Sequence, residues 1–323
     1  MTEPRRTRWI RIGPLGVGMS LPGRRDTGAP AAVTTGPPGR EAWKNGRTGS
    51  APGQGAAESQ VDPGAEALRA AAAAIDWYHT IDLGHGVVTE GLVDHRPQLD
   101  SYHLPESLRG MRCLDVASMD GFWSFELERR GADEVVAIDV ARRSDLDLPY
   151  GVREEIIRSG QDGPATAGFE FAHRALESKV DKKIVSVYEL SPERVGQFDL
   201  VFLSDLLLHL RDPQTALDHV RSVCRGVAYV ADVCHPDLET GDSTCLAEYP
   251  TWVPGEYVWW RMNANTIGSM LLEAGFDTVD ELSRFRLNVP GAKPESLPAK
   301  VVFRASVGSA ARSAGSRPMQ AVR

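Results

Sequence analysis

The stretch CLDVASMDGFWSFELERRGADEVVAIDV, Cys113 to Val140, has the pattern of a strand, a tight turn, a helix and a second strand. This order of elements begins a nucleotide-binding βαβ unit. Such turns usually carry two or three glycines, whereas residues 117–121 are Ala-Ser-Met-Asp-Gly. A loop that wraps a pyrophosphate needs a more open backbone than this. The turn therefore argues against NAD or FAD and favours an adenosine-bearing ligand without a diphosphate.

From residue 112 onward, strand and helix patterns alternate along the chain. Predicted strands cover residues 112–117, 134–139, 182–187, 198–204, 226–232, 276–283 and 299–305, and predicted helices cover 121–131, 165–177, 212–223 and 263–274. The segments DLVFLS and GVAYVAD are continuously apolar, as expected for strands covered on both faces. The alternation predicts an α/β fold with a doubly wound, mostly parallel sheet of seven strands.

The last two predicted strands are joined by a different kind of segment, the non-helical, Pro-containing stretch NVPGAKPESLP. A crossover between parallel strands normally needs a helix, so this pair is predicted to be an antiparallel hairpin. A mostly parallel sheet that ends in an antiparallel hairpin is the arrangement expected of the Rossmann-like class I methyltransferases.

The composition changes along the chain and predicts its organisation. Residues 1–62 and 307–323 are rich in small and turn-forming residues without apolar periodicity, so both are predicted to be disordered. Residues 63–110 are predicted to form a helical cap or lid, and residues 111–306 the main domain. Residues 235–262 form an insertion in that domain, which we place on the side of the acceptor.

The net charge, the cysteine spacing and the length of the apolar runs each argue against a class of function. The 323-residue chain has a net charge of −8, which leans against nucleic acid as a partner because phosphate contacts favour a basic surface. Its four cysteines have no CxxC spacing, so neither a metal site nor a redox motif is expected. No run of 18 apolar residues occurs, so no membrane span is expected. We therefore expect a cytoplasmic protein with reduced thiols.

The acids at the strand ends predict the cofactor site. Asp139 lies 18 residues after Gly121, where an acid accepts both ribose hydroxyls of a bound nucleoside, and a solvated strand end is the alternative interpretation. Asp115 is expected to orient the loop or to accept from an ammonium group of the ligand. Val187 and Tyr188 are expected to flank the adenine. The predicted cofactor residues are Asp115, Ala117, Ser118, Gly121, Asp139, Val140, Val187, Tyr188 and Ser204.

Candidate catalytic residues follow the fourth predicted strand. Asp205 is expected to face the reacting end of the cofactor, and His209 is either a base or a histidine that braces a loop. The insertion segment EYPTWVPGEYVWWRMN combines aromatic residues with an arginine, which suits stacking on a flat ring or nucleobase. Packing of these aromatic residues onto the sheet is the alternative. The predicted acceptor-side residues are Trp77, Tyr78, His79, Tyr257 and Arg261.

Four segments together resemble the tRNA wobble-uridine (mo5U34/cmo5U) methyltransferase-like family: WYHTIDLGHGVVTEG, the stretch from residue 113 to 140, LLLHLRDP and VPGEYVWWRMNANTIGSMLLEAGF. The resemblance covers about residues 75–305. It implies a class I fold, methyl-type transfer from S-adenosylmethionine, and cofactor contacts at Ala117, Asp139, Val187, Tyr188 and Ser204.

The chain departs from that family where the transferred group would be bound. The family's tRNA enzymes transfer a carboxymethyl group from carboxy-S-adenosylmethionine, and a buried carboxylate needs cationic or hydroxyl partners. The family's two lysines fall on Tyr78 and Pro97, its tyrosine on Leu208 and its arginine near Lys300. With three of the four anion partners missing, plain S-adenosylmethionine is the expected cofactor, and the carboxylated form is the alternative.

Three functions remain open at this point. The first is an S-adenosylmethionine-dependent methyltransferase with a small-molecule acceptor. The second is a tRNA wobble-uridine methyl- or carboxymethyltransferase, and the third is a cofactor-binding protein without catalysis. A tRNA enzyme requires a contiguous basic surface beside the pocket, for which the available residues are Arg142, Arg143, Arg153, Arg158, Arg211 and Arg261.

Overall fold

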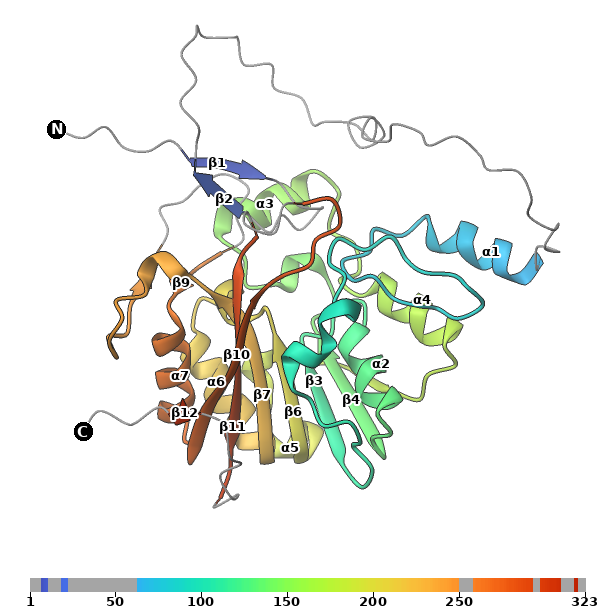
Figure 1. Ribbon diagram of the computed structural model, residues 1–323. Helices are drawn as coiled ribbons and strands as arrows, with labels where there is room; N and C mark the ends of the chain where they lie inside the picture. Colours follow the sequence, from blue (N-terminus) through green and yellow to red (C-terminus); the bar gives the residue numbers. More distant parts are fainter. Residues whose placement is uncertain are drawn as a thin grey trace, which may run out of the picture.

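The computed structural model describes residues 63–249, 258–292 and 297–308, together with three short strands outside these ranges (Figure 1). Two of those strands, β1 (Thr7–Ile10) and β2 (Met19–Pro22), pair antiparallel. The disorder predicted for the rest of residues 1–62, and for most of residues 307–323, lies outside the described residues.

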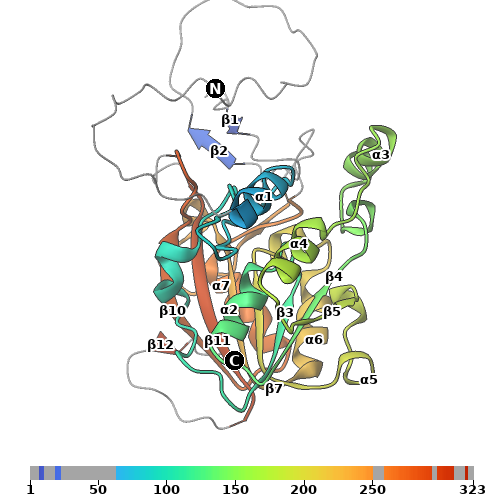
Figure 2. The same ribbon diagram turned by 90° about the vertical axis from the view of Figure 1, so that its right-hand side faces the viewer.

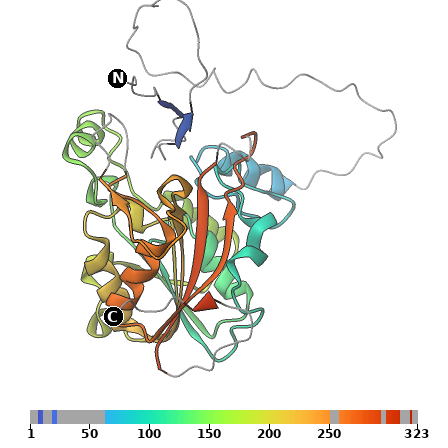
Figure 3. The same cartoon turned by 60° about the vertical axis from the view of Figure 1, so that its left-hand side comes forward.

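The main sheet has the strand order β12-β10-β11-β7-β6-β3-β4-β5. Its strands are β3 (Arg112–Val116), β4 (Glu134–Asp139), β5 (Asp181–Ile184), β6 (Phe198–Ser204), β7 (Cys224–Cys234), β10 (Thr278–Arg286), β11 (Ala299–Ser306) and the two-residue β12 (Arg317–Pro318). The five strands from β3 to β7 are parallel, whereas β11 pairs antiparallel with both β7 and β10. The predicted seven-stranded class I sheet with a terminal antiparallel hairpin is confirmed, and β12 is added at its edge. Figure 3 shows the hairpin strands β10 and β11 running side by side.

Helices cover both faces of the sheet. They are α1 (Pro63–Ala72), α2 (Phe122–Arg129), α3 (Tyr150–Arg158), α4 (Ala167–Ala175), α5 (Pro192–Val195), α6 (Pro213–Val223) and α7 (Ala264–Glu273). Apolar side chains of α6 and α7 pack on one face of the sheet, and those of α1, α2 and α4 pack on the other. Neighbouring residues of β6 belong to the two opposite cores, Val201 to the first and Phe202 to the second. This explains why β6 is apolar without alternation.

Capping residues set the starts of two predicted helices. Asp212 accepts the Thr215 backbone N–H at 3.1 Å before α6, whose first residue is a proline. Asn263 accepts the Thr266 N–H at 2.9 Å before α7. Such side chains satisfy backbone donors that have no partner within the helix. The predicted helices therefore agree with the structure to within a few residues.

Several elements differ from the prediction, among them one strand and one helix near the pocket. The strand predicted over residues 182–187 ends at Ile184, because Ser186 begins the 3₁₀ turn η4 (Val187–Glu189) and its side chain accepts the Tyr188 N–H. Helix α3 was not expected, because only Val152 and Ile156 form its buried face. Figure 2 shows α3 projecting beyond the body of the domain.

The segment before the main domain packs on the face that carries α2. After α1 it has little regular structure apart from the 3₁₀ helix η2 (Arg96–Tyr102), and backbone hydrogen bonds such as Thr80 N–H to Val93 O (2.8 Å) hold it together. Tyr102 is fully buried, with its ring centroid 4.3 Å from that of Trp123 on α2. We call residues 73–110 the cap. In the insertion, the turn η6 (Pro236–Leu238) precedes the paired strands β8 (Ala247–Glu248) and β9 (Arg261–Met262), and residues 250–257 lie outside the described part.

Candidate functional site

A pocket lies at the carboxyl ends of β3, β4 and β6, the place where open parallel sheets bind ligands. The turn after β3, the segment after β4, the turn η4, the segment after β6 and the cap form its walls. It is lined by these predicted residues: Asp115, Ala117, Asp139, Val140, Val187, Tyr188, Ser204, Asp205, His209, Tyr78 and His79. The structure thus brings together residues that are spread over more than 130 positions of the sequence.

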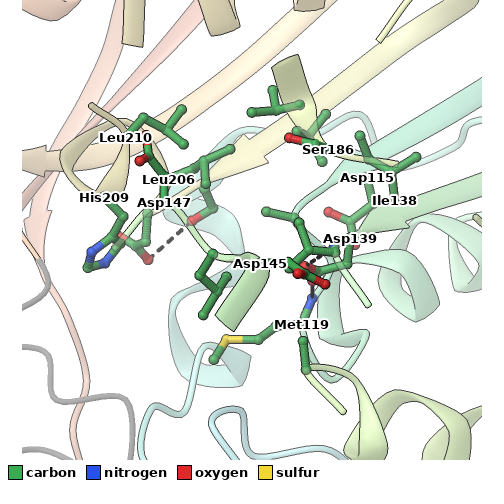
Figure 4. Close-up of a pocket in the computed structure, with 18 of the residues that line it drawn as sticks. Asp115, Met119, Ile138, Asp139, Asp145, Asp147, Ser186, Leu206, His209 and Leu210 are labelled. Carbon is green, nitrogen blue, oxygen red and sulfur yellow. Dashed lines mark hydrogen bonds between the residues drawn. The ribbon is translucent and has the colours of Figure 1, made fainter. Parts of the chain in front are cut away.

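Asp139 holds the turn after β3 in place. Its carboxylate accepts the Met119 N–H and the Val140 N–H, each at 2.7 Å, and the side chain is buried. Burial raises the pKa of Asp139, and the two N–H donors oppose that rise. Each carboxylate oxygen has more than one acceptor position, so the group can still accept from a ligand hydroxyl. Figure 4 shows Asp139 and Met119 joined by this hydrogen bond.

The turn achieves its shape with few glycines because two other residues adopt left-handed backbone conformations. Ala117 has φ +60° and Met119 has φ +52°. A left-handed conformation costs a non-glycine residue free energy and is typical of binding loops. Ser118 between them, a predicted cofactor residue, does not line the pocket: its side chain is buried, and its N–H donates to Ile138 O at 3.0 Å.

Gly121 is a predicted cofactor residue, but it does not line the pocket. Its φ is +90°, and a Cβ atom there would lie 2.6 Å from the ring of Phe125 and 2.7 Å from that of Phe169. The glycine is therefore required for packing α2 against α4.

Asp115, at the end of β3, is almost fully buried beside the pocket. The Ser124 hydroxyl donates to its carboxylate at 2.5 Å. Burial raises the pKa of Asp115 to about 7, and the Ser124 hydrogen bond and the charge of His79 limit the rise. A carboxyl group with a pKa of about 7 is partly ionised at neutral pH. Its ionised form pairs with a cationic group of a ligand.

Asp205 and Lys300 form an ion pair at the floor of the pocket. The Lys300 side chain is fully buried, and its Nζ donates to Asp205 Oδ2 at 2.5 Å and to Ser204 Oγ at 2.7 Å. Asp205 has φ +51°, and its Oδ1 is buried without a hydrogen-bond partner among the described residues. One oxygen of this carboxylate is thus occupied and the other is left for a ligand or water.

Asp120 joins the cap to the turn after β3. Its Oδ2 accepts the N–H groups of Tyr78 (2.8 Å) and His79 (2.9 Å), and its Oδ1 pairs with Nδ1 of the His79 ring. Both His79 and Asp120 are buried. We had not predicted Asp120, because nothing local in the sequence distinguishes it from an ordinary turn aspartate.

The other end of the pocket is formed by the segments after β4 and β6. The Tyr188 hydroxyl donates to Asp147 at 2.8 Å and accepts the Asp212 N–H at 3.1 Å. Figure 4 shows His209 and Asp147 well apart from Asp115 and Asp139. Pocket residues that we had not predicted include Met119, Trp123, Arg143, Asp145, Leu146, Asp147, Leu148 and Ser186. In the segment after β4, the alternation of aspartate and leucine in SDLDLP was the only sequence signal for a role in the pocket.

Two predicted acceptor-side residues do not reach the pocket, and Tyr257 lies outside the described residues. Trp77 is buried, and its Nε1 donates to Ala72 O at 2.9 Å at the end of α1. Arg261 on β9 pairs with Asp237 at 2.6 Å and with Glu248. In the same insertion, Trp259 packs inward and donates from Nε1 to Asp147 O at 2.6 Å.

Among the described residues, no group of three His, Cys, Asp or Glu side chains could hold a metal ion. The same part of the chain has no helix of the length and apolarity needed to cross a membrane.

Comparisons with known proteins agree with this geometry. A family described as "Methyltransferase domain" matches residues 97–281. A ubiquinone biosynthesis O-methyltransferase of Bordetella avium (strain 197N) is 32% identical over 114 residues, which are 35% of this chain and 38% of that protein. The N-terminal domain of EvdMO1, crystallised in the presence of SAH and D-fucose, superposes with a TM-score of 0.51 and 18% identity over 77% of this chain and 98% of that one. At this identity, the structural likeness concerns the fold alone.

Proposed function

The chain belongs to the methyltransferase domain family, and we propose that it transfers a methyl group to a small-molecule acceptor. Its domain is of class I, the Rossmann-like type that depends on S-adenosylmethionine. When bound, this cofactor supplies a methyl group already activated on a positively charged sulfur.

The proposed cofactor site uses the residues at the strand ends. Asp139 accepts the ribose hydroxyls, as acids at this place in such folds do. Asp115 accepts the ammonium group, which its ionised carboxylate can pair with. The predicted adenine neighbours Val187 and Tyr188 both line the pocket, which supports their assignment to the ring.

The charges around the pocket support plain S-adenosylmethionine over its carboxylated form. The lining residues include five aspartates, Asp115, Asp139, Asp145, Asp147 and Asp205, against a single arginine, Arg143. Such surroundings favour a cation and disfavour an additional carboxylate. Lys300, which matches the arginine of the tRNA enzymes, is already paired with Asp205.

The observation that carries the choice of acceptor is that four of the six arginines named above are paired with acids. Arg142 pairs with Asp162 (2.9 Å), Arg211 with Asp147 (4.0 Å), and Arg158 with Glu155. Arg261 is also held by acids, as described above. Nucleic acid is bound chiefly through unneutralised basic groups on its phosphates. A mixed surface of this kind supports a small molecule over tRNA.

Asp205 and His209 both line the pocket, and we assign them the positioning of the acceptor, His209 from the end of the pocket away from Asp115 and Asp139. Methyl transfer from a sulfonium is an in-line displacement, so the protein mainly has to align the acceptor with the methyl group, and alignment contributes roughly 7–11 kcal/mol at most. The free Oδ1 of Asp205 offers a fixed hydrogen-bond acceptor for that purpose.

Calorimetry of the purified protein tests the cofactor, with S-adenosylmethionine and carboxy-S-adenosylmethionine compared under the same conditions. We expect the plain form to bind more tightly. Mass spectrometry of tRNA from a deletion strain tests the alternative acceptor, because loss of a wobble-uridine modification would establish the tRNA function instead. Cofactor binding without turnover of any acceptor would favour the non-catalytic alternative.

A further inference from the structure

His79 occupies a position in the pocket wall that the proposed alignment function does not use. Its side chain is 6% exposed and its ring lines the pocket, while Nδ1 is bound to the carboxylate of Asp120. Nε2 makes no hydrogen bond within the described part of the chain. A carboxylate on Nδ1 fixes the tautomer that carries its proton there, which leaves the lone pair on Nε2. The pair therefore has the arrangement of an oriented base.

We propose that His79, oriented by Asp120, is the general base of the reaction, and that the acceptor atom is the oxygen of an uncharged alcohol or phenol. This inference rests on the proposed function, because it presumes that S-adenosylmethionine occupies the pocket.

The position of the reacting sulfur follows from the two ends of the cofactor that flank it. The sulfur links the ribose, assigned to Asp139, with the amino-acid chain, whose ammonium group is assigned to Asp115. It must therefore lie between these two carboxylates. His79 is close enough to Asp115 to influence its pKa. His209 belongs to the opposite end of the pocket (Figure 4), so His79 is the histidine nearer to the transferred methyl group.

The carboxylates of the pocket are less suited to accept the proton. Protonation of Asp205 would leave the ammonium of Lys300 unpaired in a fully buried position, which is costly. Asp139 is engaged by two backbone N–H groups and is assigned to the ribose. Protonation of His79, in contrast, leaves an imidazolium beside the Asp120 carboxylate, so the product charge is balanced within the pair.

The groups that surround the His79 ring are compatible with this role. Tyr78 lies edge-on at 4.7 Å between ring centroids, and Phe122 of α2 stacks at 5.6 Å. His95 lies at 5.3 Å, and burial, with the charges of Lys300 and His79, lowers its pKa well below the usual range, so it adds no positive charge. The acids that act on this region are Asp115 and Asp120 beside His79, together with Asp205 and Asp232, whose charges act on the neighbouring Tyr78.

The aspartates that line the pocket favour some classes of acceptor group over others. A carboxylate or thiolate acceptor needs no base, and it would be repelled by Asp139 and Asp145, lining aspartates that form no ion pair among the described residues. An amine would be held as its ammonium form by the same aspartates, which removes the lone pair that has to attack. A neutral hydroxyl group is neither repelled nor inactivated, and it needs a base because its proton is weakly acidic.

Methyl transfer to a hydroxyl group conserves atoms and charge. The hydroxyl oxygen forms a bond to the methyl carbon while the carbon–sulfur bond breaks and its electron pair stays on sulfur, giving a neutral thioether. The hydroxyl proton passes to His79 Nε2 and is later released to water. The products are a methyl ether, S-adenosylhomocysteine and one proton.

The test begins with wild-type protein, methyl-labelled S-adenosylmethionine and two matched sets of probes. The aromatic set is catechol, 1,2-diaminobenzene and benzoate, and the sugar set is glucose, glucosamine and glucuronate. Mass-spectrometric fragmentation locates the methyl group in each product. We expect transfer to hydroxyl oxygen. Transfer only to nitrogen or carboxylate oxygen, or to no hydroxyl in either set, overturns the inference, whereas S-adenosylhomocysteine binding by the same protein tests the proposed function separately.

The variants H79Q and D120N then test the assigned roles with the acceptor identified. Because general bases typically contribute 10²–10⁴-fold, H79Q should lower kcat by about 100-fold or more and abolish the fall in kcat on the acidic side of the pH profile. The Kd for S-adenosylhomocysteine should stay within about threefold. D120N should lower kcat less, since the imidazole remains. H85Q, at an exposed histidine of the cap, is the matched control.

One outcome with H79Q would overturn the assignment of His79 as the general base. If H79Q weakens S-adenosylhomocysteine binding by tenfold or more and leaves kcat and its pH profile unchanged, His79 anchors the cofactor and is not the base. Should D120N fail to fold because Asp120 also holds two backbone N–H groups of the cap, H79Q and H79N still decide the question.

Discussion

The ammonium group of Lys300 on β11 lies 2.5 Å from the carboxylate of Asp205 after β6, and the lysine side chain has no exposure to solvent. The two residues are 95 positions apart, and their pairing ties the terminal hairpin to the floor of the pocket. Removal of one partner leaves the other charge buried and uncompensated, whereas removal of both does not.

A double-mutant cycle should reveal this coupling. We expect K300M to destabilise the fold by about 3–5 kcal/mol in urea unfolding, and K300M/D205N to cost less than the sum of the single substitutions. K183M, at a partly exposed lysine of β5, is the control and should have little effect. Strict additivity would show that the pair is not coupled.

Asp139 should dominate cofactor affinity. Replacement by alanine removes a charged acceptor of the ribose and frees the Met119 N–H, so we expect S-adenosylhomocysteine to bind roughly 10- to 100-fold more weakly by calorimetry. D181A, which removes a more exposed carboxylate at the start of β5, should leave the Kd unchanged. Unaltered affinity of D139A would remove the basis of the cofactor assignment.

Asp115 should make cofactor binding depend on pH. Burial raises its pKa to about 7, so the carboxyl is neutral below that pH and ionised above it. The cofactor ammonium pairs only with the ionised form, and the affinity for S-adenosylhomocysteine should therefore rise from pH 5.5 to 7.5, by at most tenfold per pH unit. D115N should flatten this rise in calorimetric titrations. An equally steep pH dependence in D115N would assign the titration to another group.

Ala117 is strained by its left-handed backbone, and glycine should relieve the strain. The conformation costs an alanine about 1–2 kcal/mol, and the added freedom of glycine in the unfolded chain costs about 0.5–1 kcal/mol. We expect A117G to be more stable by about 0.5–1 kcal/mol in urea unfolding. A132G, at a turn alanine without positive φ, should be destabilised by a similar amount. Equal destabilisation of both variants would show that the left-handed backbone of Ala117 is not strained.

Gly121 should tolerate alanine much less well than another left-handed glycine. Both Gly121 and Gly110 have positive φ, but only at Gly121 would a Cβ atom collide with aromatic rings. We expect G110A to cost about 1–2 kcal/mol for the backbone alone, and G121A about 1–3 kcal/mol more because of overpacking. Thermal and urea unfolding of the two variants measure the difference. A similar loss in both would mean that the phenyl rings move aside.

Much of the fold was predictable because its signals are local. The apolar runs of β6 and β7 and the caps of α6 and α7 lie within the elements that they specify. The missed helix α3 shows the limit, since it buries only two side chains and has a weak apolar pattern. The segment after β4 lines the pocket through loop residues, and its only sequence pattern is the short polar–apolar alternation of SDLDLP.

The site was predictable only in part for a related reason. Asp115 and Asp139 were found because acids at strand ends meet at one edge of a parallel sheet. Gly121 was assigned to the ligand, whereas its neighbours Phe125 and Phe169 show that it serves packing. Asp120 was overlooked because its partners lie about 40 residues earlier in the cap.

The sequence by itself determined the α/β class, the antiparallel end of the sheet and the strand-end acids, since these depend on residue order within short segments. Only the tertiary structure decided that Lys300 neutralises Asp205, that Asp120 orients His79, and that four of the arginines near the pocket are paired with acids. These pairings join segments far apart in the chain. Their formation depends on how strands, cap and insertion pack together, and that information is not contained in any local pattern.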